Sequence, residues 1–404
     1  MSINFARLRS EGEAIQPKLK DYRRAFHRTP ELRMNTPKTE RLILDALRSI
    51  GLAEITAGVG STGTPGSPDR EEGHGVVALI RGALPGKCLA IRSDMDGLPI
   101  QEETGLPFAS ENGAMHACGH DFHMAALLGA AELLWNHRDK LHGTVKLIFQ
   151  PYEEGDVGAK RMIADHVLEN PKVDAILGMH NGCHLGSDYR SGDILVTTEP
   201  TTSNIYAFKA TFRGEGGHVC LSRSRTNPVY AAAEAVVRIR NVGRQYPEAI
   251  AAVTVINAGV RNNIIPLQCV IEGSLRSFDF DMQAEIREKV LRAIHESAEA
   301  NGVSVSIETT VDVMRTRIDP ELFGAFTAIA EQVYPERLPR LLHPDMIGED
   351  FARYAELVPG FHFFLCARPE GARYPLHSPK FDLDEFVLSK AAVLFSAFAL
   401  AWQE

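Results

Sequence analysis

Short apolar runs alternate with longer apolar or amphipathic segments in the first half of the chain. Four runs have the length and composition of buried strands: Val76–Ile80, Leu89–Arg92, Val145–Phe149 and Ala175–Gly178. Between the second and third of these, the segment from Met124 to Trp135 is apolar on most of its faces, which indicates a buried helix. Strands that alternate with helices predict an α/β fold, with a mostly parallel sheet covered by helices on both faces.

Local signals mark the borders of other elements. Thr36-Pro37 predicts the N-cap and first residue of a helix, and Gly51 predicts its end. The stretch from Gly60 to Gly75 is rich in Gly, Pro and Ser, which is typical of a surface loop. Far downstream, the apolar run Phe361–Cys366 predicts one more strand of the same sheet.

The middle of the chain has a different order of predicted secondary-structure elements. It predicts, in order, strand, helix, strand, strand, helix and strand, over Ile205–Phe212, Pro228–Val242, Ala251–Asn257, Gln268–Phe278, Met282–Ala300 and Val303–Thr309. That order is the split βαβ, or ferredoxin-like, arrangement. We therefore expect a discontinuous first domain, residues 1–195 and 312–404, interrupted by an inserted α+β domain over residues 196–311.

Composition and charge restrict the partners. The 404 residues are 44% hydrophobic and 24% charged, which is ordinary for a globular protein, and the net charge is −9. Since no basic block is present, nucleic acid and anionic membranes are not expected as partners. The first residues have no apolar signal core, no run approaches the length of a membrane span, and six cysteines lie scattered without paired spacing. These features predict a cytoplasmic protein with reduced thiols.

The densest group of potential metal ligands is the stretch His116-Ala117-Cys118-Gly119-His120-Asp121-Phe122-His123. Grouping so many polar side chains is costly unless something binds them, and thiolate with imidazole favours a transition metal. Cys118 and His120 are two residues apart and would point the same way in an extended backbone. A thiolate can also bridge two cations. His116 and His123 are either ligands or structural residues, and their spacing does not decide between the two.

Carboxylates and a further histidine follow the ends of the predicted strands. Asp94 and Asp96 follow one strand, Glu153 and Glu154 follow another, and His180 closes a third. Sites in open α/β sheets form beyond the carboxyl ends of strands, so these side chains are expected to meet. Two consecutive glutamates that leave a strand point in different directions. One can therefore bind metal while the other faces a water molecule, as metal-assisted hydrolysis requires.

Eight motifs together resemble one family closely. They are Arg92-Ser93-Asp94-Met95-Asp96-Gly97-Leu98-Pro99, His116–His123, Gln150-Pro151-Tyr152-Glu153-Glu154-Gly155, Gly178-Met179-His180-Asn181, Gly214–His218, Asn263-Ile264-Ile265-Pro266, Gly348-Glu349-Asp350-Phe351 and His377-Ser378-Pro379. Their order resembles the aminoacylase/carboxypeptidase branch of the M20 metallopeptidases, a dinuclear family that includes hippurate hydrolases and auxin-conjugate amidohydrolases. The resemblance extends from about Tyr22 to the C-terminal helix.

The resemblance implies roles for individual residues. It implies a dinuclear site whose ligands are Cys118, His120, Glu154, His180 and His377. It implies Glu153 as the general base and Asp96 as the carboxylate that orients a ligand, whereas it leaves open whether Asp94 touches metal. On the inserted domain, His218 and Asn263 would reach the carbonyl or carboxylate of the substrate, often across a dimer interface. We also expect Arg276 of this domain to bind substrate.

The function expected from these features is metal-dependent hydrolysis of N-acyl amino acids or N-blocked short peptides, a small-molecule amide substrate, to a carboxylic acid and a free amino acid. Metal-bound hydroxide, generated with Glu153, would attack the amide carbon, and Glu153 would pass the proton to the leaving nitrogen. Two alternatives stay open. One is a dipeptidase or carboxypeptidase with the same site, and the other is a catalytically silent metal-binding protein, against which the retention of Glu153 and Asp96 argues.

Metal identity, assembly and specificity are less constrained. We expect two divalent ions per subunit, Zn²⁺ or Mn²⁺ first and Co²⁺ or Ni²⁺ next, because thiolate and imidazole favour the softer ions and carboxylates admit manganese. A homodimer or homotetramer is expected, with the inserted domain as lid and dimerisation domain. Two segments depart from the family pattern, Cys220-Leu221-Ser222-Arg223 and the long loop Ser61–His74. Because both flank the expected pocket, the acyl group and amino acid are not fixed by the resemblance.

Overall fold

The computed structural model describes residues 3–63, 70–185, 188–341 and 346–402. The backbone divides into two units. The first comprises Met1–Thr201, Thr316–Pro344 and Glu349–Glu404, and the second comprises Thr202–Arg315 and Asp345–Gly348. The second unit is thus an insertion in the first, at a place close to the expected residues 196–311. Within the described ranges, no helix combines the length and apolar character needed to cross a lipid bilayer.

The first unit is built on an eight-stranded sheet with strand order β1-β2-β4-β3-β5-β14-β6-β13. The strands are β1 (Ile55–Val59), β2 (Gly75–Arg81), β3 (Leu84–Asp94), β4 (His142–Gln150), β5 (Ala175–His180), β6 (Ile194–Val196), β13 (Arg340–Leu341) and β14 (Gly360–Leu365). Its centre, β4-β3-β5-β14, is parallel, whereas β1, β2 and β6 pair antiparallel with β2, β4 and β14. The predicted strands and their mostly parallel pairing are confirmed.

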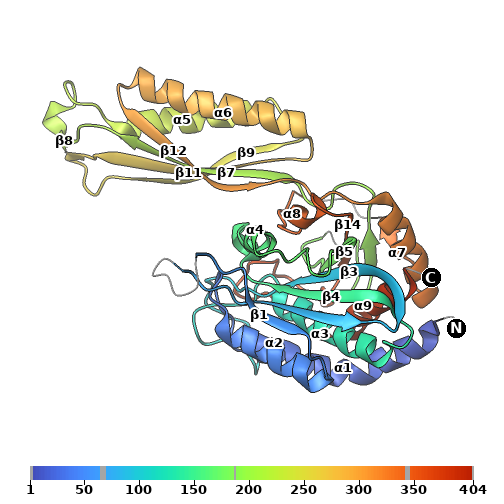
Figure 1. Cartoon of the computed structure of the whole chain (residues 1–404). Helices are drawn as coiled ribbons and strands as arrows, with labels where there is room; N and C mark the ends of the chain where they lie inside the picture. The colour runs from blue at the N-terminus through green and yellow to red at the C-terminus, as the bar shows by residue number, and fades with distance from the viewer. Residues whose placement is uncertain (1–2, 64–69, 186–187, 342–345, 403–404) are drawn as a thin grey trace. The chain divides into compact units, whose positions relative to one another are not determined.

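Helices cover both faces of this sheet (Figure 1). One face packs against α1 (Phe5–His27), α2 (Pro37–Ile50), α3 (His120–Asn136), α7 (Pro320–Val333) and α9 (Leu388–Ala401). The other face packs against α4 (Gly158–Ala164) and α8 (Ala352–Ala355), through side chains such as Ile148, Met162 and Tyr354. Both faces of the sheet are therefore buried, which explains why its strands read as continuous apolar runs.

The ends of two helices show how the sequence sets them. Helix α2 begins at Pro37 and ends before Gly51, whose φ of 109° only glycine adopts readily, as predicted. Helix α3 begins at His120, one turn earlier than expected from Met124, because Gly119 turns the chain into the helix with a φ of 85°. Its residues are buried around most of its circumference, from His120 to Leu134. The predicted loop between Gly60 and Gly75 lies partly outside the described residues, which lack 64–69.

The second unit is a four-stranded antiparallel sheet with order β12-β7-β11-β9, covered on one face by two helices (Figure 1). Its elements are β7 (Asn204–Arg213), β8 (Gly217–His218), the 3₁₀ turn Val219–Leu221, α5 (Pro228–Gly243), β9 (Ile250–Ala258), β10 (Ile264–Ile265), β11 (Gln268–Ser277), α6 (Phe280–Ala300) and β12 (Ser304–Val313). The predicted β-α-β-β-α-β order is confirmed. The short β8–β10 ribbon was not predicted, because two-residue strands carry no periodicity.

Candidate metal centre

Four segments of the first unit deliver polar side chains to the same edge of the sheet. Strands β3, β4 and β5 run parallel, and their carboxyl ends lead to Asp96, the Glu153–Glu154 pair and His180. The fourth segment is the turn that opens α3, which carries Cys118 and His120. Parallel strands end at one edge, so residues far apart in sequence converge there. This is the convergence that the sequence predicted.

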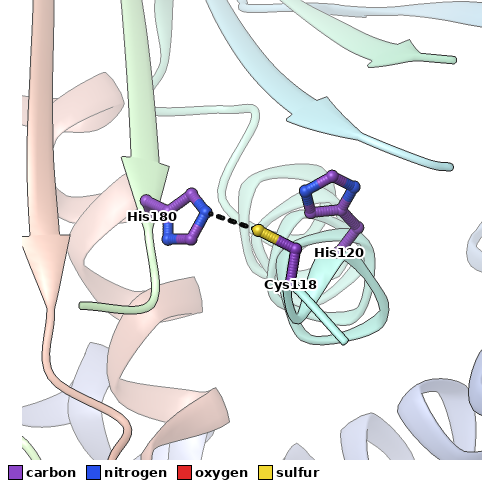
Figure 2. Close-up of side chains that lie close together, drawn as sticks. All are labelled: Cys118, His120 and His180. Carbon is purple, nitrogen blue, oxygen red and sulfur yellow. Dashed lines mark hydrogen bonds between the residues drawn. The ribbon is translucent and has the colours of Figure 1, made fainter. Parts of the chain in front are cut away.

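Cys118, His120 and His180 form the core of the group (Figure 2). One ligand atom from each lies within 4.8 Å of the others. In Figure 2 the His180 ring at the end of β5 faces the sulfur of Cys118, and Cys118 Sγ lies 3.4 Å from His180 Nε2. All three side chains are buried. Soft sulfur and imidazole nitrogens at this spacing are a donor set suited to a divalent transition metal.

Two further groups extend this core on the carboxylate side. Cys118, Glu154 and His377 share one set of potential ligand atoms within 4.8 Å, and His120, Glu153 and Glu154 share another. His377 Nε2 lies 3.4 Å from Glu154 Oε1, with the His377 side chain 51% exposed. The His377 amide donates to the Ala117 carbonyl at 2.9 Å, which ties this distant loop to the turn before α3. Sequence spacing alone could not assign His377, and the structure places it at the centre.

Unpartnered atoms test whether these residues fit a bound cation. His120 Nε2 and Glu154 Oε1 are buried and make no hydrogen bond among the described residues, although Glu154 Oε1 lies 3.4 Å from His377 Nε2. Burial, reinforced by the charges of Glu154 and Glu153, raises the pKa of the Cys118 thiol well above its usual range. A nearby cation would bind the unpartnered lone pairs and would stabilise the buried thiolate of Cys118. The residues present therefore fit a divalent metal site.

Asp96 holds the backbone that carries the glutamate pair. Its two carboxylate oxygens accept hydrogen bonds from the amides of Glu153, at 3.0 Å, and Glu154, at 3.3 Å. The Asp96 carbonyl lies 2.8 Å from His120 Nδ1, which directs the other nitrogen of that ring, Nε2, towards Glu153 Oε2 at 3.9 Å. One residue thus aligns both an imidazole and the two carboxylates. This geometry is compatible with the orienting role that the resemblance implies for Asp96.

The side chains of Asp94 and His123 form a buried hydrogen bond next to the candidate metal centre. Asp94 Oδ1 lies 2.7 Å from His123 Nδ1, and Oδ2 accepts from Arg92 Nη1 at 2.9 Å. The other nitrogen of His123, Nε2, accepts from the backbone amide and side chain of Asn181, both at 3.1 Å. Both ring nitrogens of His123 are therefore engaged, and its ring also shares a set of potential ligand atoms within 4.8 Å with Asp94 and His120. His116 is also buried, with both ring nitrogens lacking a partner among the described residues, and burial lowers its pKa to about 3.

Glu153 lies among buried carboxylates. Burial raises its pKa well above the usual range, and the negative charges of Glu349, Glu154 and Asp350 add to this. The charge of Arg92 offsets part of this effect, with Nη1 3.1 Å from Glu349 Oε1 and Nη2 2.6 Å from Asp350 Oδ1. One guanidinium facing several carboxylates leaves negative charge that bound cations would balance.

No individual role was predicted from the sequence for Arg92, Glu349 or Asp350 in this environment. Arg92 is 2% exposed and Asp350 is 2% exposed, so both are unusual core residues. The available signals were a charged residue inside the apolar run Leu89–Arg92 and an acidic pair directly before Phe351. His184 was also missed. Its ring lies 5.7 Å from that of His180, and burial lowers its pKa to about 4.

The remaining predicted residues belong to the second unit. His218 is exposed at the end of β8, where it pairs with Ile264 of β10. The Asn263 carbonyl accepts from the Val219 amide at 3.0 Å, so the ribbon keeps Asn263 beside the turn that follows His218. Arg276 Nη1 donates to the Met346 carbonyl at 2.5 Å within the same unit.

Comparisons with known proteins agree on one family. The model of peptidase family M20/M25/M40 matches residues 90–400. The chain is 33% identical to thermostable carboxypeptidase 1 of Saccharolobus solfataricus, over 98% of each chain. It is 32% identical to the N-acetyl-L-cysteine deacetylase of Bacillus subtilis, over 94% of this chain and 86% of that one. A solved Bacillus subtilis structure, described as a dinuclear metal binding peptidase from the M20 family, superposes with a TM-score of 0.76 at 31% identity, over 96% of this chain and 99% of that one.

Proposed function

The chain belongs to peptidase family M20/M25/M40 and is a hydrolase, and we propose that it is a metal-dependent amidohydrolase. Its proposed substrates are N-acyl amino acids or N-blocked short peptides, which it cleaves to a carboxylic acid and a free amino acid. The relative named as an N-acetyl-L-cysteine deacetylase supports this substrate class. The structural observation that carries the proposal is the convergence of Cys118, His120, Glu154 and His180 beside Glu153.

The proposed metal ligands are Cys118, His120, Glu154, His180 and His377, which together would hold two divalent ions. When bound, these ions would polarise the amide carbonyl and lower the pKa of a water molecule. The solved dinuclear relative supports the number of ions, and the donor set favours zinc or manganese, with cobalt or nickel as alternatives. The unpartnered buried atoms His120 Nε2 and Glu154 Oε1 support the same assignment.

Glu153 is the proposed general base. Its amide is tied to Asp96, while its side chain points towards His120. Held there, the carboxylate would accept a proton from the attacking water and pass it to the leaving nitrogen, which cannot depart as an anion. Asp96 is the proposed orienting residue, because it aligns the His120 ring and both glutamates. Glu154 Oε1 lies beside His377 and Glu153 Oε2 beside His120, so one glutamate could bind metal while the other moves a proton.

His218, Asn263 and Arg276 are the proposed substrate contacts of the second unit. An amide oxygen gains negative charge during attack, and an imidazole donor placed there would stabilise the transition state. We expect His218→Ala to lower kcat by roughly 10²-fold while metal content is unchanged. The proposal extends to a cytoplasmic homodimer. If His218 acts across the dimer, mixing inactive His218→Ala with inactive Glu153→Gln protein restores part of the activity. Wild-type rates for His218→Ala would exclude its role.

A carboxypeptidase or dipeptidase is the second candidate. It is favoured by the 33% identity to thermostable carboxypeptidase 1 over nearly the full length of both chains. The same side chains would serve, because both reactions add water to an amide next to an amino acid. The two candidates differ in what lies on the acyl side of the bond. It is an acyl group or a blocked residue in the first, and an aminoacyl or peptidyl group in the second.

A substrate and metal panel tests the proposal. The protein is stripped with a chelator, reloaded separately with Zn²⁺, Mn²⁺, Co²⁺ or Ni²⁺, and assayed on N-acetyl, N-benzoyl and N-indoleacetyl amino acids and on dipeptides. We expect no turnover by the stripped protein and restored turnover with at least one metal, highest on an N-acyl amino acid. Preference for dipeptides would favour the second candidate. Full activity of the stripped protein would overturn the metal-dependent mechanism.

A further inference from the structure

The turn that carries the two glutamates has an unfavourable backbone. It runs from Pro151 to Gly158, and two of its non-glycine residues, Tyr152 with φ 58° and Asp156 with φ 52°, are left-handed. At its end, a Cβ on Gly158 would come within 1.8 Å of the Pro151 carbonyl oxygen. Left-handed backbone costs free energy for residues with a side chain, so the surrounding structure must hold the turn in this form.

One buried carboxylate joins the two ends of this turn. Gln150, the last residue of β4, donates from Nε2 to both oxygens of Asp350, at 2.9 and 2.7 Å. Ala159, the second residue of α4, donates its amide to Asp350 Oδ2 at 2.9 Å. Gln150 immediately precedes the turn and Ala159 immediately follows it. Asp350 therefore closes the loop at its base, while Asp96 holds its tip.

The residues around Asp350 reinforce this closure. Arg353 donates to both oxygens of Asp156, at 3.1 and 2.9 Å, and so holds one of the two left-handed residues. Tyr354 donates its hydroxyl to Gln150 Oε1 at 3.0 Å. Asp350, Arg353 and Tyr354 all come from one short segment at α8, which lies beside α4 (Figure 1).

We propose that residues 349–354 are a clamp that positions the Glu153–Glu154 turn, with Asp350 and Arg353 as its positioning residues. The clamp comes from a part of the chain about 200 residues away in sequence from the turn, since Gln150 and Asp350 are separated by 200 positions. Neither residue touches substrate in this account. Both act through the turn, whose backbone fixes where the two glutamate side chains point. Asp350 also acts on Glu153 through its charge, so Arg353 is the residue that isolates the effect of the turn. The effect on catalysis rests on the proposed function, whereas the effect on the turn does not.

The alternative is that these contacts only stabilise the fold. A stabilising contact changes how much protein is folded, but the folded fraction keeps its normal turn and its normal rate. A positioning contact changes the turn in protein that is still folded. Amide hydrogen exchange in the peptide covering residues 151–159 separates the two. The Glu153 and Glu154 amides donate to Asp96, and the Ala159 amide donates to Asp350.

Two substitutions and a matched control define the experiment. Asp350→Asn keeps the shape of the side chain but places an NH₂ group against the donors of Gln150 or Ala159. Arg353→Met removes the two bonds to Asp156. The control is Arg161→Met on α4, which removes an ion pair with Glu71. Arg161 and Arg353 are similarly buried, with 11% and 16% of their side chains exposed. The Arg161 side chain donates to Glu71 and Thr62, outside the turn, and the substitution leaves its backbone bond to the Val157 carbonyl in place.

We expect exchange in residues 151–159 to accelerate at least ~10-fold in both clamp variants, with the rest of the protein unchanged. On the best substrate of the wild type, kcat per metal-loaded molecule should fall ~10-fold or more, with KM within ~3-fold. The control should match the wild type in both measurements. Unchanged exchange in the folded Arg353→Met protein would overturn the clamp, even if Asp350→Asn failed to fold. If the clamp variants exchange faster but the wild type hydrolyses no amide, the clamp is supported and the proposed function is refuted.

Discussion

Asp96→Asn is the substitution that most directly perturbs the alignment of the centre. The two oxygens of Asp96 accept one backbone amide each, from Glu153 at 3.0 Å and Glu154 at 3.3 Å. Asparagine keeps a single acceptor oxygen and turns an NH₂ group towards the second amide. One hydrogen bond to a charged group is lost and two donors are forced together inside a buried site, since Asp96 is 2% exposed.

The expected loss follows from those contacts. A hydrogen bond to a charged group contributes about 1.5–3 kcal/mol, and an opposed pair of donors adds to the loss. If the aligned arrangement of the glutamates is destabilised by about 3 kcal/mol, kcat should fall ~10²-fold, because each 1.4 kcal/mol of activation free energy is a factor of about ten in rate. We therefore expect Asp96→Asn to lower kcat by ~10²-fold in metal-loaded protein, with a smaller change in KM.

The assay is steady-state hydrolysis of the best amide substrate, with metal content and the urea midpoint measured on the same preparation. Asp174→Asn is the control, because the carboxylate of the exposed Asp174 also accepts a backbone amide, that of Cys88 at 2.8 Å, away from the centre. The control should lose some stability and keep its kcat. A wild-type kcat for metal-loaded Asp96→Asn would refute the argument that this residue aligns the glutamates.

Three further predictions concern other parts of the first unit. Cys118→Ser should lower metal content and activity together, and bound metal should protect the Cys118 thiol from alkylation, so rapid labelling of active holo-protein would contradict its role as a ligand. Lys146→Met should lower the free energy of unfolding in urea by about 3 kcal/mol, because buried Lys146 Nζ donates to three backbone carbonyls at 2.8, 2.6 and 2.9 Å; a change below about 1 kcal/mol would contradict this. Burial opposes the charged form of His27, but its bonds to Asp121 and Glu102 prevail and raise its pKa to about 9. The pKa of His27 in the unfolded chain is about 6.5, so the stability that charged His27 provides is complete below pH 6.5 and is lost as the pH rises through 9. His27→Gln should therefore lower the free energy of unfolding by about 3 kcal/mol at pH 6 and by less at pH 9. A loss that does not change with pH would contradict the raised pKa.

Much of the fold was predictable because its signals are local. The strands of the parallel centre are apolar runs, and the helix after Thr36 has both a proline start and a glycine end. The β-α-β-β-α-β order of the second unit was also readable from periodicity. The start of α3 was placed too late because its first turn, His120 to His123, is polar in sequence yet buried in the fold. Periodicity cannot foresee that polar residues are buried for their chemistry.

Some residues of the candidate site were likewise recognisable from local sequence, and others were not. Cys118, His120 and the glutamate pair are recognisable by residue type and by their place after strands. His377 and the clamp residues are not, because their partners are distant in sequence. Arg92 and Asp350 are 258 positions apart, and their 2.6 Å contact depends on the whole sheet being in place. Such residues become recognisable only when burial and partner are both known, since a buried charge without a partner would be too costly.

Proton transfer by Glu153 is the step on which the proposed hydrolysis depends, and Glu153→Gln removes it. Glutamine keeps the size of the side chain but cannot accept and return a proton. Metal content and kcat are measured on one preparation of the variant and of the wild type. We expect the variant to retain its metal and to lose at least ~10²-fold in kcat. Near-normal turnover would contradict the role of Glu153 as general base, and loss of metal would instead make it a ligand.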